Sequence, residues 1–527
     1  MSHAPLPETE LQAIVQEVMQ RLGVHDSPAQ LAHSAPAQLA HSAPAQLAHS
    51  APAQLAHSAP AQLTHSAPKQ SSHARLASPS VSAADGPGLY RDLEAAVAGA
   101  RSSFLALHEL SLDQRRLMIA AIRQTVRDEA ATIAEMAVRE TGLGRADDKI
   151  QKNLLVGERT PGIEILESWC ATGDHGITLQ ELAPWGVLAA ITPSTNPTET
   201  IICNGIGMLA AGNAVVFCPH PAATRVSNYV IAALNRAVMR AGGPHSIFAG
   251  LTEPSVELAQ QLMRHPGIAL VVVTGGPAVV REAMKSGKRV IGAGPGNPPV
   301  VVDETADIER AGRDIVRGAS LDNNIVCTDE KEVFVVSSVA DRLKSAMEAS
   351  GAIEIHGPQI DRLAQLVLEP GERRDPRAAF VRKDWVGQDA HRFLEALGIR
   401  AHQQTRLLIA EVDRDHPVVW TELLMPILPI VRVRDAEEAM DLAVAAEKGN
   451  RHTASMHSHH VDRLSRMARR IDCSIFVKNG PNFAGLGMGG EGYTSFTIAG
   501  PTGEGMTHAR HFARMRRCTL VDAFRIV

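Results

Sequence analysis

The stretch GVLAAITPSTNPTETIICNGIGMLAAGNAVVFCP, residues 186–219, contains two short apolar runs separated by a longer segment with a helical pattern. Short apolar runs bounded by Gly and Pro are typical of buried strands, and a helix between two of them is typical of a βαβ unit. The two strands of such a unit are parallel. The stretch therefore predicts an α/β protein with a parallel sheet.

The same alternation continues on both sides of this stretch. Further strand-like runs are SIFAG, LVVVTGG, RVIGAG and PVVVD, and a second α/β region extends from about residue 300 to 500. Residues 112–142 predict one or two long amphipathic helices. An open doubly wound sheet binds its ligands at the carboxyl ends of its strands. We therefore expect a cofactor near residues 189–197, 215–221 and 271–277.

The composition argues against several classes of protein. The chain has 527 residues, of which 45% are hydrophobic and 21% charged, an ordinary soluble composition. A net charge of −5 gives no indication of nucleic-acid binding, and the apolar runs are too short to span a bilayer. The first ten residues lack the basic and apolar regions of a secretory signal. Six cysteines without a CxxC pair indicate a reducing compartment and no structural metal site.

The N-terminal part differs in composition from the rest. Residues 1–23 predict an amphipathic helix that needs a partner surface, since a helix this short is marginal alone. Residues 24–85 repeat HSAPAQLA with a period of eight, and one Pro per repeat blocks a continuous helix. This composition predicts an extended, flexible linker. Its seven regularly spaced histidines could bind metal loosely, but expansion of a linker repeat is the favoured interpretation.

The glycines in IGAGPGNPPVVV, namely Gly292, Gly294 and Gly296, resemble a dinucleotide fingerprint only superficially. That fingerprint must open a helix, whose amide groups meet the pyrophosphate, whereas two prolines and a strand-like run follow here. We therefore reject the Rossmann interpretation. Close approach of the backbone at a crowded site is the favoured role for these glycines.

Three local patterns could carry chemistry, and each has an ordinary structural explanation as well. Cys327, in SLDNNIVCTDEKEVFVV (residues 320–336), is either a core thiol or a nucleophile. Asn196 stands between two prolines, where a rigid loop could aim its amide at an oxyanion, although Asn is also common in turns. Residues 274–277 could form an anion site where a strand meets a helix, or merely a tight turn.

Taken together, ITPSTNP, VVVTGGP, NNIVCTDEKEVFV and TELLMPILPIV have an order and spacing that resemble the aldehyde dehydrogenase superfamily. The resemblance covers roughly residues 86–527, and KGNRHTASMHS, GLGMGGEGYTSFTIAGPTGEGMT and RMRRCTL are similar to its CoA-acylating branch. It implies that Cys327 is the catalytic nucleophile and Asn196 the oxyanion-hole amide. It also implies that Glu422 contacts the nicotinamide ribose.

Departures from the hydrolytic members are informative. Gly292 stands where those members have a glutamate that activates the deacylating water. Without a base, attack by water on a thioester is slow, so a second thiol is expected to accept the acyl group. Cys218, with His220 nearby, stands near the place of a lysine that reaches the adenosine ribose, and Val280 near the place of a cofactor-turn glycine. The resemblance therefore implies NAD as cofactor and leaves NADP possible, with coenzyme A as co-substrate.

The resemblance extends to further site residues. His452 is a candidate proton acceptor or CoA-step residue, and it could equally be a structural histidine. No metal site is expected. The residues expected to bind the cofactor are Thr192, Pro193, Ser194, His220, Thr274, Gly275, Gly276, Pro277, Gly292 and Glu422.

The expected fold is aldehyde dehydrogenase-like, with two doubly wound α/β domains and a small β arm. Residues 86–295 form the NAD-binding domain and 296–500 the catalytic domain. The arm combines a hairpin at residues 168–183 with a C-terminal segment at 501–527, and its exchange between subunits implies a homodimer or homotetramer.

The implied reaction is NAD-dependent oxidation of propionaldehyde to propionyl-CoA inside a bacterial microcompartment in the cytoplasm. The N-terminal helix resembles an encapsulation peptide, whose partners are shell or cargo proteins, although it could instead dock on its own enzyme. Acetaldehyde could be the main substrate in place of propionaldehyde. The chain could also be a hydrolytic enzyme with an unrecognised base, or a catalytically weak cargo adaptor.

Overall fold

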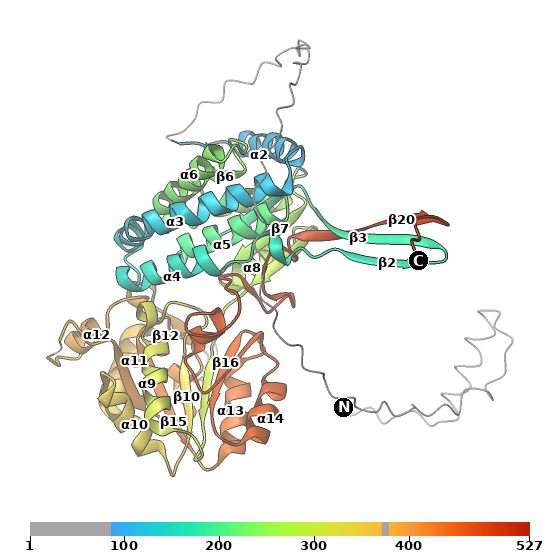
Figure 1. Ribbon diagram of the computed structural model, residues 1–527. Coiled ribbons are helices and arrows are strands. Elements are labelled where there is room, and N and C mark those ends of the chain that lie inside the picture. The colour runs from blue at the N-terminus through green and yellow to red at the C-terminus, as the bar shows by residue number, and fades with distance from the viewer. Residues whose placement is uncertain (1–85, 372–378, 401) are drawn as a thin grey trace, which may run out of the picture. The chain divides into compact units, whose positions relative to one another are not determined.

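The computed structural model of the chain describes residues 86–371, 379–400 and 402–527, which Figure 1 draws as coloured ribbons. The helix and linker predicted for residues 1–85 lie outside these ranges. Within them, no helix is both long and apolar enough to cross a membrane. The described residues form two parallel sheets, each with its own core, and an antiparallel arm.

The first sheet has six strands, all parallel. In spatial order they are β1 (Leu89–Tyr90), β6 (Phe248–Leu251), β5 (Ala214–Cys218), β4 (Val187–Ile191), β7 (Leu270–Thr274) and β8 (Arg289–Ala293). The helices that pack on these strands are α2 (Leu93–His108), α5 (Pro197–Ala210), α6 (Thr224–Arg240), α7 (Val256–Arg264) and α8 (Pro277–Met284). The βαβ unit predicted for residues 186–219 is thus confirmed as β4–α5–β5.

The central strands are buried along their whole length, which is why they appear in the sequence as continuous apolar runs. The long pattern at residues 112–142 forms one helix, α3 (Leu112–Thr141). Ser111 caps its N-terminus by accepting a hydrogen bond from the Gln114 amide, and Gly142 ends it with a left-handed φ of 69°. α3 packs against α5, α6 and a further helix, α4 (Ala146–Arg159).

The second sheet has seven parallel strands. In spatial order they are β11 (Ala352–Glu354), β14 (Leu407–Glu411), β15 (Ile427–Val433), β10 (Glu332–Val336), β9 (Pro299–Val302), β16 (Thr453–His457) and β17 (Ile475–Lys478). Its helices are α9 (Ile308–Ala319), α10 (Ala340–Ala349), α11 (Gly357–Val367), α12 (Ala390–Ala396), α13 (Ala436–Glu447) and α14 (Val461–Ile471). A strand, β9, follows the glycines of residues 292–296, so the rejection of a Rossmann turn there is confirmed.

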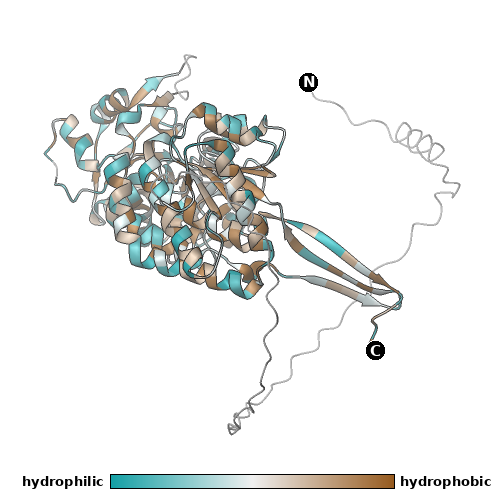
Figure 2. Cartoon of the chain, turned by 90° about the horizontal axis from the view of Figure 1, so that it is seen from above, coloured by the Kyte–Doolittle hydropathy of each residue, from teal (hydrophilic) through white to brown (hydrophobic). Residues whose placement is uncertain are grey.

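The arm is an antiparallel sheet that projects from the first sheet, as Figures 1 and 2 show. It consists of β2 (Trp169–Gly173), β3 (Gly176–Pro184) and β20 (Ala513–Val521), and β20 pairs with the whole length of β3. The predicted hairpin and C-terminal strand are therefore present. Trp169 and Met515 leave 54% and 64% of their surface exposed, so the arm presents apolar groups to its surroundings.

The last part of the chain returns to the first core. Phe483, Phe496 and Phe512 are buried there, in the core that holds the strands of the first sheet together with Ile475 and Val477 of β17. The short strands β18 (Ile498–Ala499) and β19 (Gly505–Met506) pair with each other, and β18 lies beside β8. Leu321 and Val326 also join this core, although the strands on either side of them belong to the second sheet. The segment before Cys327 therefore lies where the two cores meet.

Candidate active site

The strand order of the first sheet reverses at β4. After β4 the chain adds β5 and β6 on one side, and then β7 and β8 on the other. Such a reversal opens a crevice at the carboxyl ends of the two strands beside it, here β4 and β7. The loop of residues 192–196 follows β4, and Gly275 and Gly276 follow β7. Two of the three segments predicted to meet a cofactor therefore flank this crevice.

The turn after β7 leaves room for a ligand. Thr274 ends the strand, and its hydroxyl lies 2.8 Å from that of Thr497. Gly276 caps α8, and Pro277 is the first residue of that helix, so a strand does meet a helix at residues 274–277. A Cβ atom added at Gly276 would meet nothing within 4 Å among the described residues. The Gly275 amide donates to the Ala293 carbonyl at 3.1 Å, so Gly276 is the position of the turn that is open to an approaching anionic group.

The third predicted segment follows β5, next to β4. Thr192 is buried and its amide donates to the Cys218 carbonyl at 3.3 Å, which ties the two strand ends together. Burial raises the pKa of the Cys218 thiol to about 12, so this thiol stays neutral. His220 is exposed, and its Nδ1 accepts from the Ala222 amide at 3.1 Å. Pro193 and Ser194 are half-buried in the loop between Thr192 and Asn196.

Cys327 follows a left-handed turn. Asp322, Asn323 and Asn324 have φ angles of 47°, 56° and 64°, a region that Asp and Asn tolerate best among residues with a Cβ. Their side chains hold the turn: Nδ2 of Asn323 donates to the Gly387 carbonyl at 2.9 Å, and Nδ2 of Asn324 to that of Ala319 at 2.8 Å. The two asparagines before the cysteine therefore fix the backbone that presents it.

Lys331 also stabilises the segment that precedes Cys327. Its buried ammonium donates to the Asn324 carbonyl at 2.8 Å, to Oδ1 of Asn324 at 2.7 Å and to the Val326 carbonyl at 3.0 Å. These bonds use its three protons. The segment that leads into Cys327 is thus held by a buried cation.

Gly296 brings three predicted residues to one point. A Cβ atom there would lie 2.6 Å from the Cys327 carbonyl oxygen and 2.9 Å from Cγ of His452. The Gly296 amide donates to Oε1 of Glu422 at 3.3 Å. Cys327, His452 and Glu422 therefore surround one backbone position that only glycine can occupy. The close approach predicted from this glycine is confirmed.

The titratable groups around Gly296 are strongly shifted. Burial, assisted by Glu422 and opposed by Lys331, raises the pKa of the Cys327 thiol to about 12. Burial raises the pKa of Glu422 to about 7, again against the charge of Lys331. Burial and then Lys331 lower the pKa of His452 to about 3. Cys327, Glu422 and His452 therefore share an environment that disfavours charge.

His452 has one ring nitrogen available. Its Nδ1 lies 2.9 Å from the Thr453 hydroxyl, and its backbone amide donates to Oε1 of Glu447 at 2.8 Å. Its Nε2 is buried without a hydrogen-bond partner in the part of the chain that the structure describes. A neutral imidazole with an unpartnered nitrogen can accept a proton from a neighbouring group.

Asn196 is buried at the start of α5, and its amide is connected to the cysteine segment. Oδ1 accepts from the Lys152 ammonium at 2.6 Å, and the same ammonium lies 2.5 Å from Oδ2 of Asp322. Lys149 also donates to Asp322, at 2.8 Å. Sequence reasoning missed Lys149, Lys152 and Asp322. Their spacing could have indicated burial, because both lysines lie on the same face of α4 as Val156, which is buried.

Gly292 does not lie in the cluster around Gly296. It is in β8, and its amide donates to the Thr502 hydroxyl at 3.0 Å. A Cβ atom there would lie 3.1 Å from Cγ1 of Val280 and 3.6 Å from Cγ2 of Thr502. Val280 and Thr502 therefore already border the space that a side chain at position 292 would enter.

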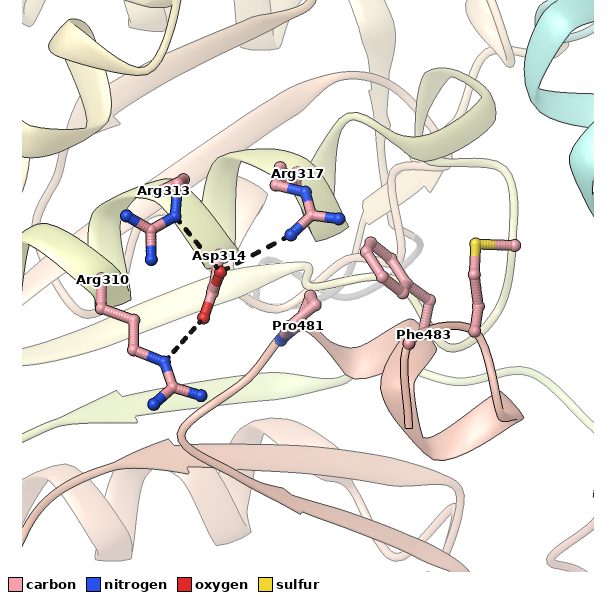
Figure 3. Close-up of a pocket in the computed structure, with 8 residues that line it drawn as sticks. Arg310, Arg313, Asp314, Arg317, Pro481 and Phe483 are labelled. Carbon is pink, nitrogen blue, oxygen red and sulfur yellow. Dashed lines mark hydrogen bonds and ion pairs between the residues drawn. The ribbon is translucent and has the colours of Figure 1, made fainter. Parts of the chain in front are cut away.

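A pocket lies beside the cysteine segment, on a surface that the sequence analysis did not single out. Figure 3 shows three arginines of α9 around the Asp314 carboxylate at the rim of this cavity of about 470 Å³. A second cavity, of about 560 Å³, shares Arg317 and Phe483 with it and extends to Leu321. Next to Phe483, the Asn482 side-chain amide donates to the carbonyl of Thr328, the residue after Cys327. The second cavity therefore reaches the start of the segment that leads to Cys327, at Ser320 and Leu321.

The sequence is similar to known proteins over most of its length. The model of the Aldehyde dehydrogenase family matches residues 84–365 and 401–508. An acetaldehyde dehydrogenase (acetylating), EutE, of Salmonella typhimurium is 52% identical over 441 residues, which are 84% of this chain and 94% of that protein. A propanal dehydrogenase (CoA-propanoylating) of the same organism is 46% identical over 442 residues, with the same two shares.

Solved structures are similar over the same part of the chain. A propionaldehyde dehydrogenase from the Clostridium phytofermentans fucose utilisation bacterial microcompartment matches with a TM-score of 0.81 and 44% identity, over 84% of this chain and all of that one. An engineered glycolyl-CoA reductase with bound NADP⁺ matches with a TM-score of 0.81 and 46% identity, also over 84% of this chain and all of that one. A Rhodopseudomonas palustris propionaldehyde dehydrogenase with bound CoA and an acylated cysteine matches with a TM-score of 0.80 and 46% identity. This match covers 84% of this chain and 99% of that one.

Proposed function

We propose that this chain, which belongs to the aldehyde dehydrogenase family, oxidises a short aldehyde and transfers the acyl group to coenzyme A. The observation that carries this proposal is the meeting of Cys327, Glu422 and His452 at Gly296. The backbone of Cys327 and two candidate proton acceptors meet there, and a nucleophilic thiol needs such an acceptor close by. A cargo adaptor would need no such cluster.

In the first step the Cys327 sulfur attacks the aldehyde carbon, and the thiol proton passes to the Glu422 carboxylate or to Nε2 of His452. Glu422, whose pKa is about 7, is the stronger base of the two, since the pKa of His452 is about 3. Both acceptors are neighbours of Gly296, as Cys327 is, and Nε2 is unpartnered among the described residues. The new alkoxide is held by Nδ2 of Asn196 and by the backbone amide of Cys327. These residues thus stabilise the thiohemiacetal.

A nicotinamide dinucleotide, when bound, would supply the hydride acceptor whose reduction turns the adduct into a thioester on Cys327. The residues that would hold it fit such a group in two respects. The turn is open at Gly276, beside the start of α8, and the buried Thr192 hydroxyl is unpartnered within the described ranges. The full set proposed here is Thr192, Pro193, Ser194, His220, Thr274, Gly275, Gly276, Pro277, Gly292 and Glu422. NAD is the proposed dinucleotide, with NADP as the second candidate.

In the second step the CoA thiolate attacks the thioester, and the Cys327 thiolate leaves. Gly292 supplies no carboxylate to activate water, and Val280 and Thr502 bound the space beside it. Hydrolysis of the thioester therefore lacks a base at this position, and transfer to a thiol is favoured. Because the thiolate and not the thiol is the nucleophile, the CoA thiol must lose its proton, and His452 is also proposed to accept it.

The test is NADH formation from propionaldehyde by the purified full chain, with and without CoA. With CoA we expect many turnovers per subunit and propionyl-CoA as product. Without CoA we expect a single burst of about one NADH per active site, because the thioester then has no acceptor. Equal steady rates with and without CoA, with free propionate as product, would contradict the proposal. No turnover under either condition would favour a cargo adaptor.

Propionaldehyde is the proposed substrate and acetaldehyde the second candidate, since both kinds of enzyme occur among the relatives. The comparison of kcat/KM for the two aldehydes decides between them. We also propose a homo-oligomer, dimer or tetramer, built through the arm, whose exposed apolar groups support it. Sedimentation of the purified protein measures its size.

The proposed location is a bacterial microcompartment in the cytoplasm, because a relative of known structure comes from such a compartment. Residues 1–23 are proposed to direct it there, through shell or cargo proteins. A fluorescent protein fused to residues 1–23 should gather in foci in cells that make shells and spread evenly in cells that make none. Even fluorescence in both kinds of cell would argue that this segment docks elsewhere.

A further inference from the structure

Lys152 lies in α4 with its ammonium fully buried. The ammonium has three oxygen partners: Oδ1 of Asn196 at 2.6 Å, Oδ2 of Asp322 at 2.5 Å and Oε1 of Glu199 at 3.0 Å. It donates hydrogen bonds to Asn196 and Asp322 and forms an ion pair with Glu199. The first of these bonds goes to the amide that the proposed function assigns to the oxyanion.

This contact decides which way the Asn196 amide faces. The oxygen and nitrogen of an amide have nearly the same shape, so the hydrogen-bond network settles the orientation. Reversing the amide would turn the Nδ2 hydrogens toward the ammonium, where two donors repel. Nδ2 therefore faces away from Lys152, where one hydrogen reaches the Thr195 hydroxyl at 3.3 Å. The other hydrogen remains for a ligand.

The contact also affects the strength of the amide as a donor. A hydrogen bond from a charged group is shorter and stronger than one between neutral groups. Electron density drawn to Oδ1 leaves the Nδ2 hydrogens more positive, and hydrogen bonds in a chain strengthen one another. An oxyanion is stabilised most by donors that are already oriented before the charge develops.

We propose that Lys152 is a positioning residue that orients and polarises the Asn196 amide toward the oxyanion. This inference rests on the proposed role of Asn196. It adds a residue that does not touch the substrate and that acts on the rate only through Asn196.

The surrounding charges allow a matched comparison. Lys149, Lys152, Asp322 and Glu199 are all buried, two cations with two anions. Lys149 donates to Asp322 and to the Thr195 carbonyl at 3.1 Å, and not to the Asn196 side chain. The variants Lys152→Met/Glu199→Gln and Lys149→Met/Glu199→Gln therefore each remove one cation and one anion. They differ in whether the contact with Asn196 is lost.

The readout is the rate of the NADH burst in the absence of CoA, which reports the steps up to the thioester. We expect Lys152→Met/Glu199→Gln to slow the burst about 10- to 100-fold, and Lys149→Met/Glu199→Gln to change it by less than about threefold. The rate at which iodoacetamide alkylates Cys327 should stay within about twofold of the parent in both. A general collapse of the site would change that rate too. Equal slowing of the burst by both pairs would overturn the proposal.

A double-mutant cycle with Asn196→Ala separates positioning from any other role. Asn196→Ala alone should slow the burst about 10²- to 10³-fold. Adding Lys152→Met/Glu199→Gln should then cost less than about threefold more, since the amide is already absent. Additive losses would overturn the role of Lys152 while leaving that of Asn196 intact. If Asn196→Ala keeps the parent rate, the oxyanion role itself fails.

If the Met variant does not fold, Lys152→Gln/Glu199→Gln takes its place in the same cycle, because Gln restores a neutral donor. Orientation is then retained in part and polarisation is lost. We expect about tenfold slowing of the burst in the parent and less than about threefold in Asn196→Ala. An unchanged burst in the parent would overturn the proposal.

Discussion

We expect Cys327→Ala to lower kcat for CoA-dependent aldehyde oxidation by about 10⁴-fold or more, the usual cost of removing a covalent nucleophile. Without the sulfur the aldehyde cannot form the tetrahedral adduct from which hydride leaves, and no thioester can be handed to CoA. NADH formation at saturating aldehyde and CoA measures the loss. Aldehyde binding should be nearly unaffected, so the effect should fall on kcat.

Cys473→Ala is the matched control. Cys473 is also partly buried, and burial and Glu447 raise the pKa of its thiol to about 12, as happens at Cys327. Its sulfur donates to the Ile475 carbonyl at 3.0 Å. We expect Cys473→Ala to keep kcat within about threefold. If Cys327→Ala turned over as fast as Cys473→Ala, the nucleophile would have to be sought elsewhere.

The sequence predicted the two sheets well because parallel strands buried on both faces appear as continuous apolar runs. β4, β5 and β7 are fully or almost fully buried, and each run was recognised. The return of residues such as Phe496 and Phe512 to the first core was not predicted. β18 and β19 have two residues each, too few to produce a periodic pattern. Their position depends on contacts with strands about 200 residues earlier in the chain.

The site was predicted from the order of several segments, not from any one of them. Cys327, Glu422 and His452 are far apart in the sequence, and only the fold brings them to Gly296. The buried charges were missed because lysine is rarely fully buried unless paired, so Lys152 is expected at the surface. Its partner Asp322 follows 170 residues later. Nothing local in the sequence reveals that the two meet.

Asp322→Ala should destabilise the fold by about 3–5 kcal/mol, because it removes the carboxylate that both Lys149 and Lys152 contact and leaves two buried cations with Glu199. The urea midpoint at fixed protein concentration measures this loss. Burial alone would raise the pKa of the Asp322 carboxyl, but the two ammonium groups outweigh it and lower the pKa. The contribution of Asp322 is therefore complete above its unfolded pKa, about 3.9, and is lost as the pH falls below it. The difference between parent and variant should shrink only below about pH 4.

Two further substitutions separate the charge from the backbone. Asp322→Asn keeps a residue that tolerates the φ of 47° and removes only the charge. We expect Asp322→Asn to lower the free energy of unfolding by about 1 kcal/mol less than Asp322→Ala does, because alanine also pays the cost of the left-handed conformation. Asp341 forms a comparable ion pair with Arg432 at the surface, where 78% of its side chain is exposed. Asp341→Ala should cost less than about 1 kcal/mol. Equal losses of stability at positions 322 and 341 would contradict this prediction. Burial of the ion pairs with Lys149 and Lys152 would then not explain why Asp322 stabilises the fold.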